Sequence, residues 1–145
     1  MIINKKNIFE EALKGNLVVL NHKDVSVIKD CEGETPLHYL ARKEKVEVLK
    51  HKDVSVVEER RGVTPLHTLA FEGKVEVLSH KDVSIVKDNT NRTPLHWLAI
   101  SIKVPRKWIK EKYPWFNLGE REINSELITE ILNTQNACKF IEGIK

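Results

Sequence analysis

Apolar residues recur along the chain in a helical pattern that begins after a threonine–proline pair. Three stripes of two leucines and an alanine follow Thr35, Thr64 and Thr93, and their members are Leu37, Leu40, Ala41, Leu66, Leu69, Ala70, Leu95, Leu98 and Ala99. Residues three and four apart share one face of a helix. A threonine hydroxyl caps the free N–H groups of the first turn, and proline at the first helical position loses no hydrogen bond. The pattern therefore predicts three short amphipathic helices.

A second, shorter apolar segment follows each predicted helix. It begins near Val46 and Val75 and is so short that a helix there must be held by packing. We then expect an extended stretch over residues 25–29, 54–58 and 83–87, ending in a turn. Gly33, Gly62 and Asn91 stand two residues before the threonine, and these residue types suit the positive φ of a tight turn.

These segments repeat with a fixed period of 29 residues. Thr-Pro-Leu-His begins at residues 35, 64 and 93, and His-Lys-Asp-Val-Ser begins at residues 22, 51 and 80. Self-similarity of this length indicates a stack of supersecondary units that bury their faces on one another.

The motifs Thr-Pro-Leu-His-x-Leu-Ala and Asp-Val-Ser, with the turn from Asp30 to Thr35, resemble the ankyrin repeat family. The resemblance covers residues 7 to about 104. It implies an all-α solenoid of L-shaped units, each with two antiparallel helices and a projecting hairpin-like loop. The inner helices and loops of such units form a concave binding surface. The period is shorter than the roughly 33 residues of that family, and the shortening falls in the second helix.

The repeat predicts a single domain, residues 1–145, in five parts. Residues 1–34 form an N-terminal capping unit, residues 35–63 and 64–92 are regular repeats, residues 93–119 are a divergent repeat, and residues 120–145 form a helical C-terminal cap. Pro105 opens a helix that Pro114 ends, and apolar residues from Ile123 to Leu132 mark another. We expect a break at residues 133–136 and a last turn or two over residues 137–141.

Composition excludes several classes of protein. The 145 residues are 41% hydrophobic and carry a formal charge of +3, too even a balance to point to nucleic acid or an anionic membrane. Two cysteines cannot build a disulfide framework, the N-terminus lacks the pattern of a signal peptide, and no run approaches the ~20 apolar residues that span a bilayer. We expect a cytoplasmic, intracellular monomer with no membrane association, cofactor or small-molecule substrate.

Six histidines raise the question of a metal site. By the resemblance, His38, His67 and His96 bridge each capping threonine to a carbonyl in a neighbouring loop. The other three, His22, His51 and His80, fall at the end of the outer helix, where a partial positive charge suits the helix dipole. Equivalent residues of stacked helices lie roughly 8–10 Å apart, whereas zinc ligands converge at about 2 Å. Each set therefore predicts a structural ladder and no metal site.

The sequence also lacks signals for catalysis. It has no phosphate-binding loop, nucleophile elbow or His-Glu-x-x-His motif. Cys31 lies in a projecting turn between Asp30 and Glu32, and nearby carboxylates oppose thiolate formation. We expect no enzymatic activity.

A basic segment offers an alternative function. Five basic residues surround Trp108, namely Lys103, Arg106, Lys107, Lys110 and Lys112. Together with Arg60, Arg61 and Arg92 they make a nucleic-acid-associated protein the alternative hypothesis, because basic side chains with an aromatic ring can grip phosphates and stack a base. A solvated helix face with a buried tryptophan explains the same pattern.

The main hypothesis is a non-catalytic protein–protein interaction module or scaffold. In a repeat array the fixed positions build the stack, and positions that vary between units are free to face a partner protein. These candidates follow the inner-helix alanine or lie at the loop tips: Arg42, Lys43, Phe71, Glu72, Ile100, Ser101, Glu32, Glu34, Arg60, Arg61, Val63 and Arg92. Phe71 and Ile100 are apolar where exposure is expected, which is typical of contact hot spots. Ordinary tolerated surface residues are the alternative interpretation.

Overall fold

The computed structural model describes residues 2–134 and 137–144, which form seven α-helices and three short 3-10 helices (η) without a strand. The elements are α1 (Ile8–Leu13), η1 (Leu17–Asn21), α2 (Pro36–Arg42), η2 (Val46–Lys50), α3 (Pro65–Phe71), η3 (Val75–Ser79), α4 (Pro94–Ser101), α5 (Arg106–Lys112), α6 (Ser125–Thr134) and α7 (Ala137–Ile144). The predicted all-α class is confirmed, and the α/η pair recurs at the predicted spacing of about 29 residues.

The three motif helices begin as the sequence predicts. Each capping threonine is extended, proline occupies the first turn, and the threonine and the histidine three residues later form a reciprocal capping box. The helices end at a left-handed residue, which is Glu44 after α2 (φ 61°), Gly73 after α3 (φ 78°) and Lys103 after α4 (φ 54°). This geometry stops each helix after two turns and sends the chain into the next segment.

The second element of the first three units is a five-residue 3-10 helix, and η2 and η3 lie where the short apolar segment was predicted. The expectation of an extended stretch directly after it was wrong in its first half. Residues 25–27, 54–56 and 83–85 belong to a turn, in which the Ile28 amide donates to the Asp24 carbonyl at 3.1 Å. The turn buries Val25, Val54 and Val83 under the inner helices.

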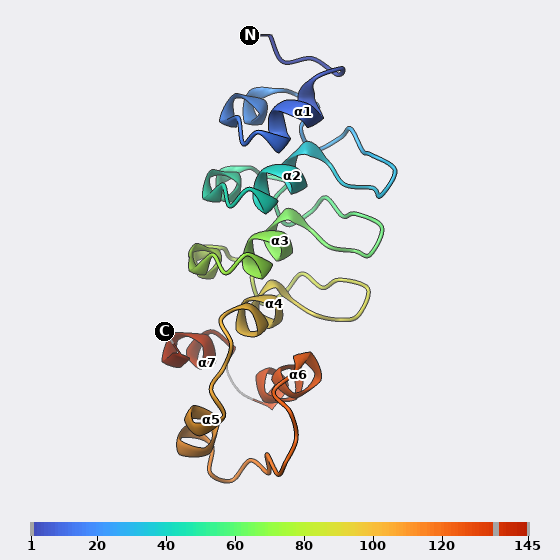
Figure 1. Ribbon diagram of the computed structural model, residues 1–145. Coiled ribbons are helices and arrows are strands. Elements are labelled where there is room, and N and C mark those ends of the chain that lie inside the picture. The colour runs from blue at the N-terminus through green and yellow to red at the C-terminus, as the bar shows by residue number, and fades with distance from the viewer. Residues whose placement is uncertain (1, 135–136, 145) are drawn as a thin grey trace.

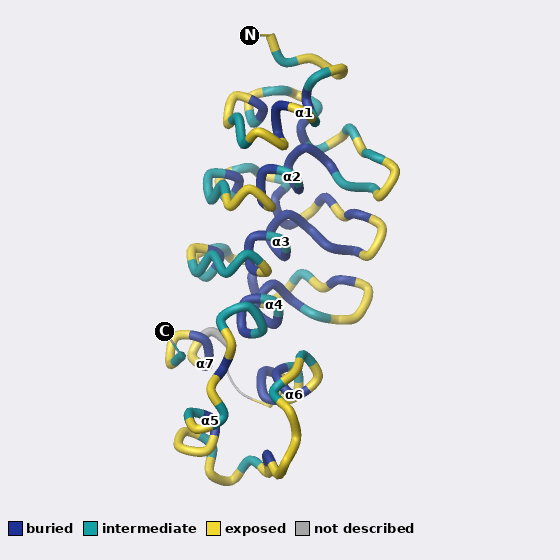
Figure 2. Tube along the Cα trace, in the orientation of Figure 1, coloured by how far each residue is buried: buried dark blue, intermediate teal, exposed yellow. Residues whose placement is uncertain are grey.

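Helices α1 to α4 pack one on the next in sequence order, with the 3-10 helices on one side and the loops projecting on the other (Figure 1). The leucine and alanine stripes of α2, α3 and α4 are buried. They form the continuous dark-blue band along the middle of the stack (Figure 2). Burial of these apolar faces between neighbouring units is the main stabilising contribution to the array.

Helices α6 and α7 pack against α4 and cover the last repeat. The Trp108 ring of α5 contacts Phe140 of α7 edge-on at 5.1 Å, and its indole N–H donates to the Gly143 carbonyl at 3.0 Å. The helix predicted between Pro105 and Pro114 is confirmed as α5. Helix α6 contains the predicted apolar residues from Leu127 to Leu132, but Ile123 precedes the helix, which begins at Ser125. The predicted break begins too early, because Asn133 and Thr134 belong to α6. Residues 135–136 lie outside the described residues. None of the described helices has the length and apolar character needed to cross a membrane.

Candidate functional site

The projecting loops are closed hairpins built around an acidic residue. In the first loop, the Asp30 amide donates to the Glu34 carbonyl at 2.9 Å, and the Asp30 carboxylate accepts from the Glu32 and Glu34 amides at 2.9 Å. Glu59 and Asp88 occupy the equivalent positions and close their loops in the same way. These bonds close each loop, and the loops form a wall beside helices α2 to α4.

Neighbouring loops contact each other through their backbones. The Arg60 amide donates to the Glu32 carbonyl at 3.1 Å, and the Asn89 amide donates to the Arg61 carbonyl at 2.9 Å. A Cβ atom on Gly62 (φ 79°) would lie 2.9 Å from the Asn89 backbone nitrogen. Glycine at this position therefore allows both the positive φ and the close approach of the next loop.

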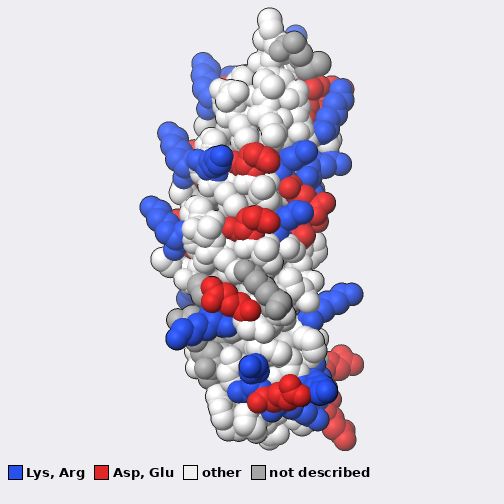
Figure 3. Space-filling view, turned by 90° about the vertical axis from the view of Figure 1, so that its left-hand side faces the viewer, with Lys and Arg blue, Asp and Glu red and all other residues white. Residues whose placement is uncertain are grey.

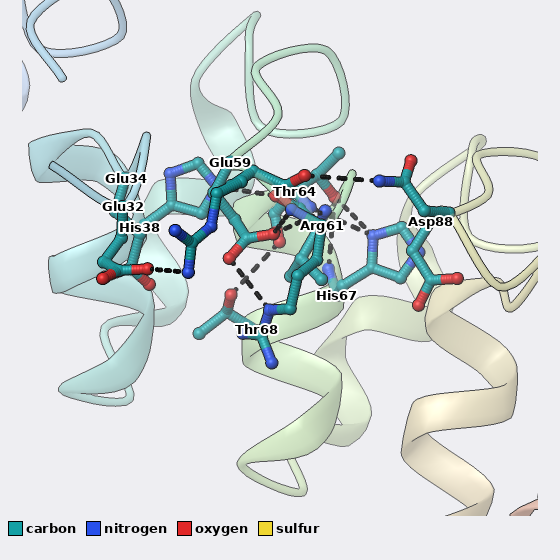
Figure 4. A network of polar contacts seen from close by, with 12 residues as sticks. Glu32, Glu34, His38, Glu59, Arg61, Thr64, His67, Thr68 and Asp88 are labelled. Atoms are coloured by element: carbon teal, nitrogen blue, oxygen red, sulfur yellow. Dashed lines mark hydrogen bonds and ion pairs between the residues drawn. The ribbon is translucent and has the colours of Figure 1, made fainter. Parts of the chain in front are cut away.

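Two of the three buried histidines, His38 and His67, link the start of their helix to the next loop (Figure 4). The Thr35 amide donates to Nδ1 of His38 at 3.1 Å, so the ring carries its proton on Nε2, which donates to the Val63 carbonyl at 2.8 Å. His67 repeats this arrangement with Thr64 and with the Arg92 carbonyl at 2.9 Å. The predicted bridge is thus present for these two histidines.

His96 completes only half of the bridge. Its Nδ1 accepts from the Thr93 amide at 2.8 Å, but its buried Nε2 has no hydrogen-bond partner of good geometry within the described part of the chain. Asn133 of α6 is a polar neighbour of the ring, which faces the C-terminal cap where another loop would otherwise continue the stack.

Burial favours the neutral form of all three imidazoles. It lowers the pKa of His38 to about 4, against the opposing effect of the hydrogen bond to Val63. Burial likewise lowers the pKa of His67, and burial together with the charge of Arg92 lowers the pKa of His96. These rings are therefore neutral structural groups at pH 7.

The second histidine set lies directly after the 3-10 helices, at the end of the second helix of the unit as the sequence predicts. Nδ1 of His22, His51 and His80 accepts a hydrogen bond from the amide two residues later at 3.0–3.1 Å. Each ring therefore caps the turn that follows its 3-10 helix, and the interaction with the helix dipole stays a prediction.

No group of three or more histidine, cysteine, aspartate or glutamate side chains converges as a metal site within residues 2–134 and 137–144. Cys31 is exposed in the first loop.

A pocket of about 250 Å³ lies between the loops and helices α2 to α4. We call it the inner pocket and the surface that carries it the inner face. Its lining combines loop residues with helix residues: Glu34, Arg42, Arg61, Val63, His67, Thr68, Phe71, Glu72 and Trp97. Six of these (Glu34, Arg42, Arg61, Val63, Phe71 and Glu72) are among the variable positions selected from the sequence.

The inner pocket has an aromatic wall. Phe71 is 55% exposed at the end of α3, and its ring contacts Trp97 of α4 edge-on at 5.5 Å. The sequence pattern correctly predicted that Phe71 is exposed, and it lies in a position suited to contact another molecule.

Three arginines of the inner face and its loop tips are paired with glutamates. Arg42 lies 3.1 Å from the Glu34 carboxylate, and its guanidinium stacks over the Tyr39 ring at 4.6 Å. At the loop tips, Arg60 pairs with Glu32 at 2.6 Å and Arg61 pairs with Glu59 at 3.1 Å. Burial raises the pKa of Glu34, with Arg42 opposing the shift. The face is therefore polar without a large excess of either charge.

Three predicted contact residues are less accessible than expected. Val63 is buried beneath its loop, although its side chain reaches the inner pocket and its carbonyl binds His38. Ile100 is half-buried beside Ile123 and Ile128, because the C-terminal cap covers this end of α4. Ser101 is also half-buried. Repeat phase alone did not show that the cap covers the last helix.

The remaining candidates differ in their surroundings. Lys43 is exposed at the end of α2, and Glu72 is half-buried in the pocket lining. The Arg92 guanidinium donates a hydrogen bond to the Ser125 hydroxyl at 2.9 Å. The backbone carbonyl of Arg92 accepts the hydrogen bond from Nε2 of His67. Arg92 thus joins the last loop to the cap.

The basic segment is partly occupied by internal contacts. Arg106 donates to the carbonyls of Gly119 and Arg121, and Lys107 lies 3.9 Å from Glu111. Lys103, Lys110 and Lys112 are exposed. On the face seen in Figure 3, basic and acidic side chains are interleaved rather than separated by sign.

One set of contacts on the inner face was not predicted from the sequence. The Tyr39 hydroxyl donates to the Asp30 carboxylate, and the Trp97 indole N–H donates to the Asp88 carboxylate at 3.0 Å. Burial and Asp30 raise the pKa of Tyr39 to about 12. The signal was available, since an acidic residue stands nine positions before the variable helix residue in each of the three units that carry the Thr-Pro-Leu-His motif.

Comparison with known proteins gave no relative: no protein-family model matches the chain, and no curated protein shows significant similarity to it.

Proposed function

We propose that the chain is an ankyrin-like solenoid that binds a partner protein through its inner face and has no catalytic role. Residues 1–34 act as the N-terminal capping unit and residues 120–145 as the helical C-terminal cap. The capped helix starts, the closed loops and the stacking of α1 to α4 support this assignment. Its concave surface corresponds to the inner face.

The observation that carries the proposal is the exposed Phe71 beside Trp97 in the wall of the inner pocket. An aromatic side chain that packs at the edge of a pocket and is surrounded by polar groups is typical of an interface hot spot. Stacking does not require an aromatic residue at this position, because the equivalent residue of the preceding repeat is Arg42.

The titratable groups support binding rather than catalysis. The ring nitrogens of His38 and His67 are engaged in hydrogen bonds within the repeat. A general acid or base needs a ring nitrogen that can reach a substrate. These histidines therefore serve the scaffold.

The test is affinity capture from source cells with the wild-type chain, Phe71→Ala and the control Val18→Ala. Val18 is a similarly exposed apolar residue (51%) on η1, away from the inner face. We expect Phe71→Ala to reduce recovery of specific proteins about tenfold or more, as truncation of a hot spot does, and Val18→Ala to leave it unchanged. Equal recovery with both variants contradicts the proposal.

Nuclease treatment before capture distinguishes the proposed protein binding from the alternative function, which is nucleic-acid binding. Proteins that bind the inner face directly stay bound after nucleic acid is removed. If recovery instead disappears with the nuclease, the chain acts on nucleic acid and the proposal is wrong. Thermal unfolding of each variant confirms that the change affects binding and not folding.

A further inference from the structure

The residues Tyr39, Thr68 and Trp97 occupy the same position of three successive motif helices. In the first and third of these units an aromatic side chain fills the angle between helix and loop. Tyr39 reaches the Asp30 carboxylate and Trp97 reaches the Asp88 carboxylate, so each ring is held by a hydrogen bond to its own loop.

The middle unit lacks this aromatic side chain. The Thr68 hydroxyl donates to the Thr64 carbonyl at 3.2 Å, and the loop carboxylate of Glu59 binds Nε of Arg61 at 3.1 Å instead (Figure 4). The inner pocket lies at this gap, with Thr68 in its lining and Trp97 from the next unit in its wall. The pocket is thus the space left by an aromatic residue that the repeat pattern omits.

The size and walls of the gap suit one side chain. Its volume of about 250 Å³ is below the roughly 300–1,000 Å³ of small-molecule sites. An inserted ring would meet the exposed face of Phe71 and the Trp97 ring, and aromatic pairs of this kind favour edge-to-face contact. In the neighbouring unit, Arg42, which also lines the pocket, stacks over the Tyr39 ring in a cation–π contact.

The charged side chains that line the pocket do not favour a charged ligand, because both signs are present in equal number. Two arginines, Arg42 and Arg61, face two glutamates, Glu34 and Glu72. Arg42 and Glu34 form an ion pair at 3.1 Å, and the burial that raises the pKa of Glu34 reflects a site partly shielded from water. A neutral occupant with a hydrogen-bond donor fits such a site better than a free charge, because the donor can bind a carboxylate at the rim while the ring packs on the aromatic wall.

We propose that the gap at Thr68 binds a tyrosine or tryptophan side chain of the partner protein. The partner's ring takes the place that Tyr39 and Trp97 fill in the adjacent units. This inference rests on the proposed function, since it names the chemical class of side chain that the inner face receives.

The experiment titrates the ¹⁵N-labelled chain with capped tripeptides, Ac-Gly-X-Gly-NH₂, in which X is tyrosine, tryptophan, leucine or arginine. We expect the tyrosine and tryptophan peptides to shift the Thr68 and Phe71 amides and the Trp97 indole N–H saturably. Their binding should be about fivefold tighter than that of the leucine and arginine peptides, the size of one aromatic contact. Equal or tighter binding of the leucine or arginine peptide overturns the proposal, as does the absence of saturable shifts.

Thr68→Tyr provides the matched variant, because it copies the first unit into the gap and keeps the Trp97 indole N–H as a reporter of peptide binding. We expect it to fold with a stability near that of wild type and to lose at least fivefold in affinity for both aromatic peptides, while Thr68→Ala keeps it. Unchanged affinity in folded Thr68→Tyr overturns the proposal. If this variant fails to fold, the ranking of the four peptides on the wild-type chain decides.

Partner capture separates this inference from the proposed function. Lost recovery with Phe71→Ala but no preference for aromatic peptides means that the inner face binds a partner and that the gap at Thr68 is not its aromatic site. Unchanged recovery with Phe71→Ala would instead contradict the proposed function itself.

Discussion

The interior of the stack and its two ends contain the same repeat residues, but the polar groups of these residues have different hydrogen-bond partners in the two places. Between units, the hydroxyls of Ser26 and Ser55 donate to the carboxylates of Asp53 and Asp82 at 2.7 Å. Asp24 is the equivalent carboxylate of the first unit and has no preceding serine. Its buried Oδ2 has no hydrogen-bond partner among the described residues.

The C-terminal end shows the complementary difference. His38 and His67 donate to the loop of the following unit, whereas Nε2 of His96 faces the helical cap without such a carbonyl. Each motif therefore contains half of an interaction, and the neighbouring unit supplies the other half. This is the nearest-neighbour behaviour expected of a repeat array, and the following predictions test it from the largest expected effect to the smallest.

The largest effect is expected from replacing an interior histidine. His67→Ala removes a buried ring and leaves the Thr64 amide and the Arg92 carbonyl without partners, so it should reduce the free energy of unfolding by roughly 3–5 kcal/mol. His96→Ala should cost about 1–2 kcal/mol less, because only one of its ring nitrogens is satisfied. Urea unfolding measures both, and equal losses would contradict the difference between interior and end.

Acid should destabilise the stack in a defined window. The folded pKa of His38 is about 4 and its unfolded value is about 6.5, so the unfolded chain binds the proton more readily. The stabilisation is fully present above about pH 6.5 and is lost as the pH falls toward 4, a change of about 3 kcal/mol for this residue.

Urea unfolding at pH 7, 6, 5 and 4.5 checks this window. Hydrogen bonds, working against burial, lower the pKa of the Asp30 and Asp88 carboxylates, so those groups lose their stabilisation at lower pH. In His38→Gln the pH dependence should become shallower. A free energy of unfolding that stays constant from pH 7 to 4.5 would show that the buried rings are not forced to be neutral.

A smaller effect is expected where loops pack on one another. Gly62→Ala places a Cβ 2.9 Å from the Asn89 amide nitrogen at a positive φ, and should destabilise the chain by about 2 kcal/mol. Asn91 has the same backbone geometry (φ 65°) in the last projecting loop of the series. Asn91→Gly should therefore be neutral or stabilising by up to about 1 kcal/mol in thermal unfolding. Destabilisation by Asn91→Gly would contradict the view that the positive φ at this position is what favours glycine there.

The smallest effect is expected at the helix ends. Glu44→Gly relieves a left-handed residue (φ 61°) but removes the ion pair with Lys74 at 3.2 Å, so the net gain should be about 0.5 kcal/mol. Lys103→Gly makes the same change at the C-terminal end (φ 54°) without that loss and should gain about 1 kcal/mol. Thermal unfolding compares the two, and a larger gain for Glu44→Gly would contradict this order.

Local sequence was sufficient to predict much of the fold. The capping threonines, the apolar stripes and the positive φ of Gly33, Gly62 and Asn91 depend on residues within one unit, and the structure confirms them. The 3-10 form of the second element was harder to predict, because a segment this short takes its geometry from packing against the inner helix.

The candidate site was predicted only in part. Phe71 was recognised as exposed from its position in the repeat, but Ile100 at the equivalent position of the next unit is half-buried. The difference arises because α6 packs against α4, and the sequence of α4 contains no sign of that contact. Exposure depends on what covers a side chain and not on its phase in the repeat.

The sequence by itself determined the repeating unit: its period, its helix starts, its turns and its buried stripe. Tertiary structure decided which polar groups find their hydrogen-bond partner in a neighbouring unit and where the cap covers the last helix. It also decided that a pocket opens at Thr68, between Tyr39 and Trp97. The physical reason is distance along the chain. A histidine and its carbonyl partner are 25 residues apart, and a serine and its carboxylate partner are 27 apart. Only stacking brings such groups together.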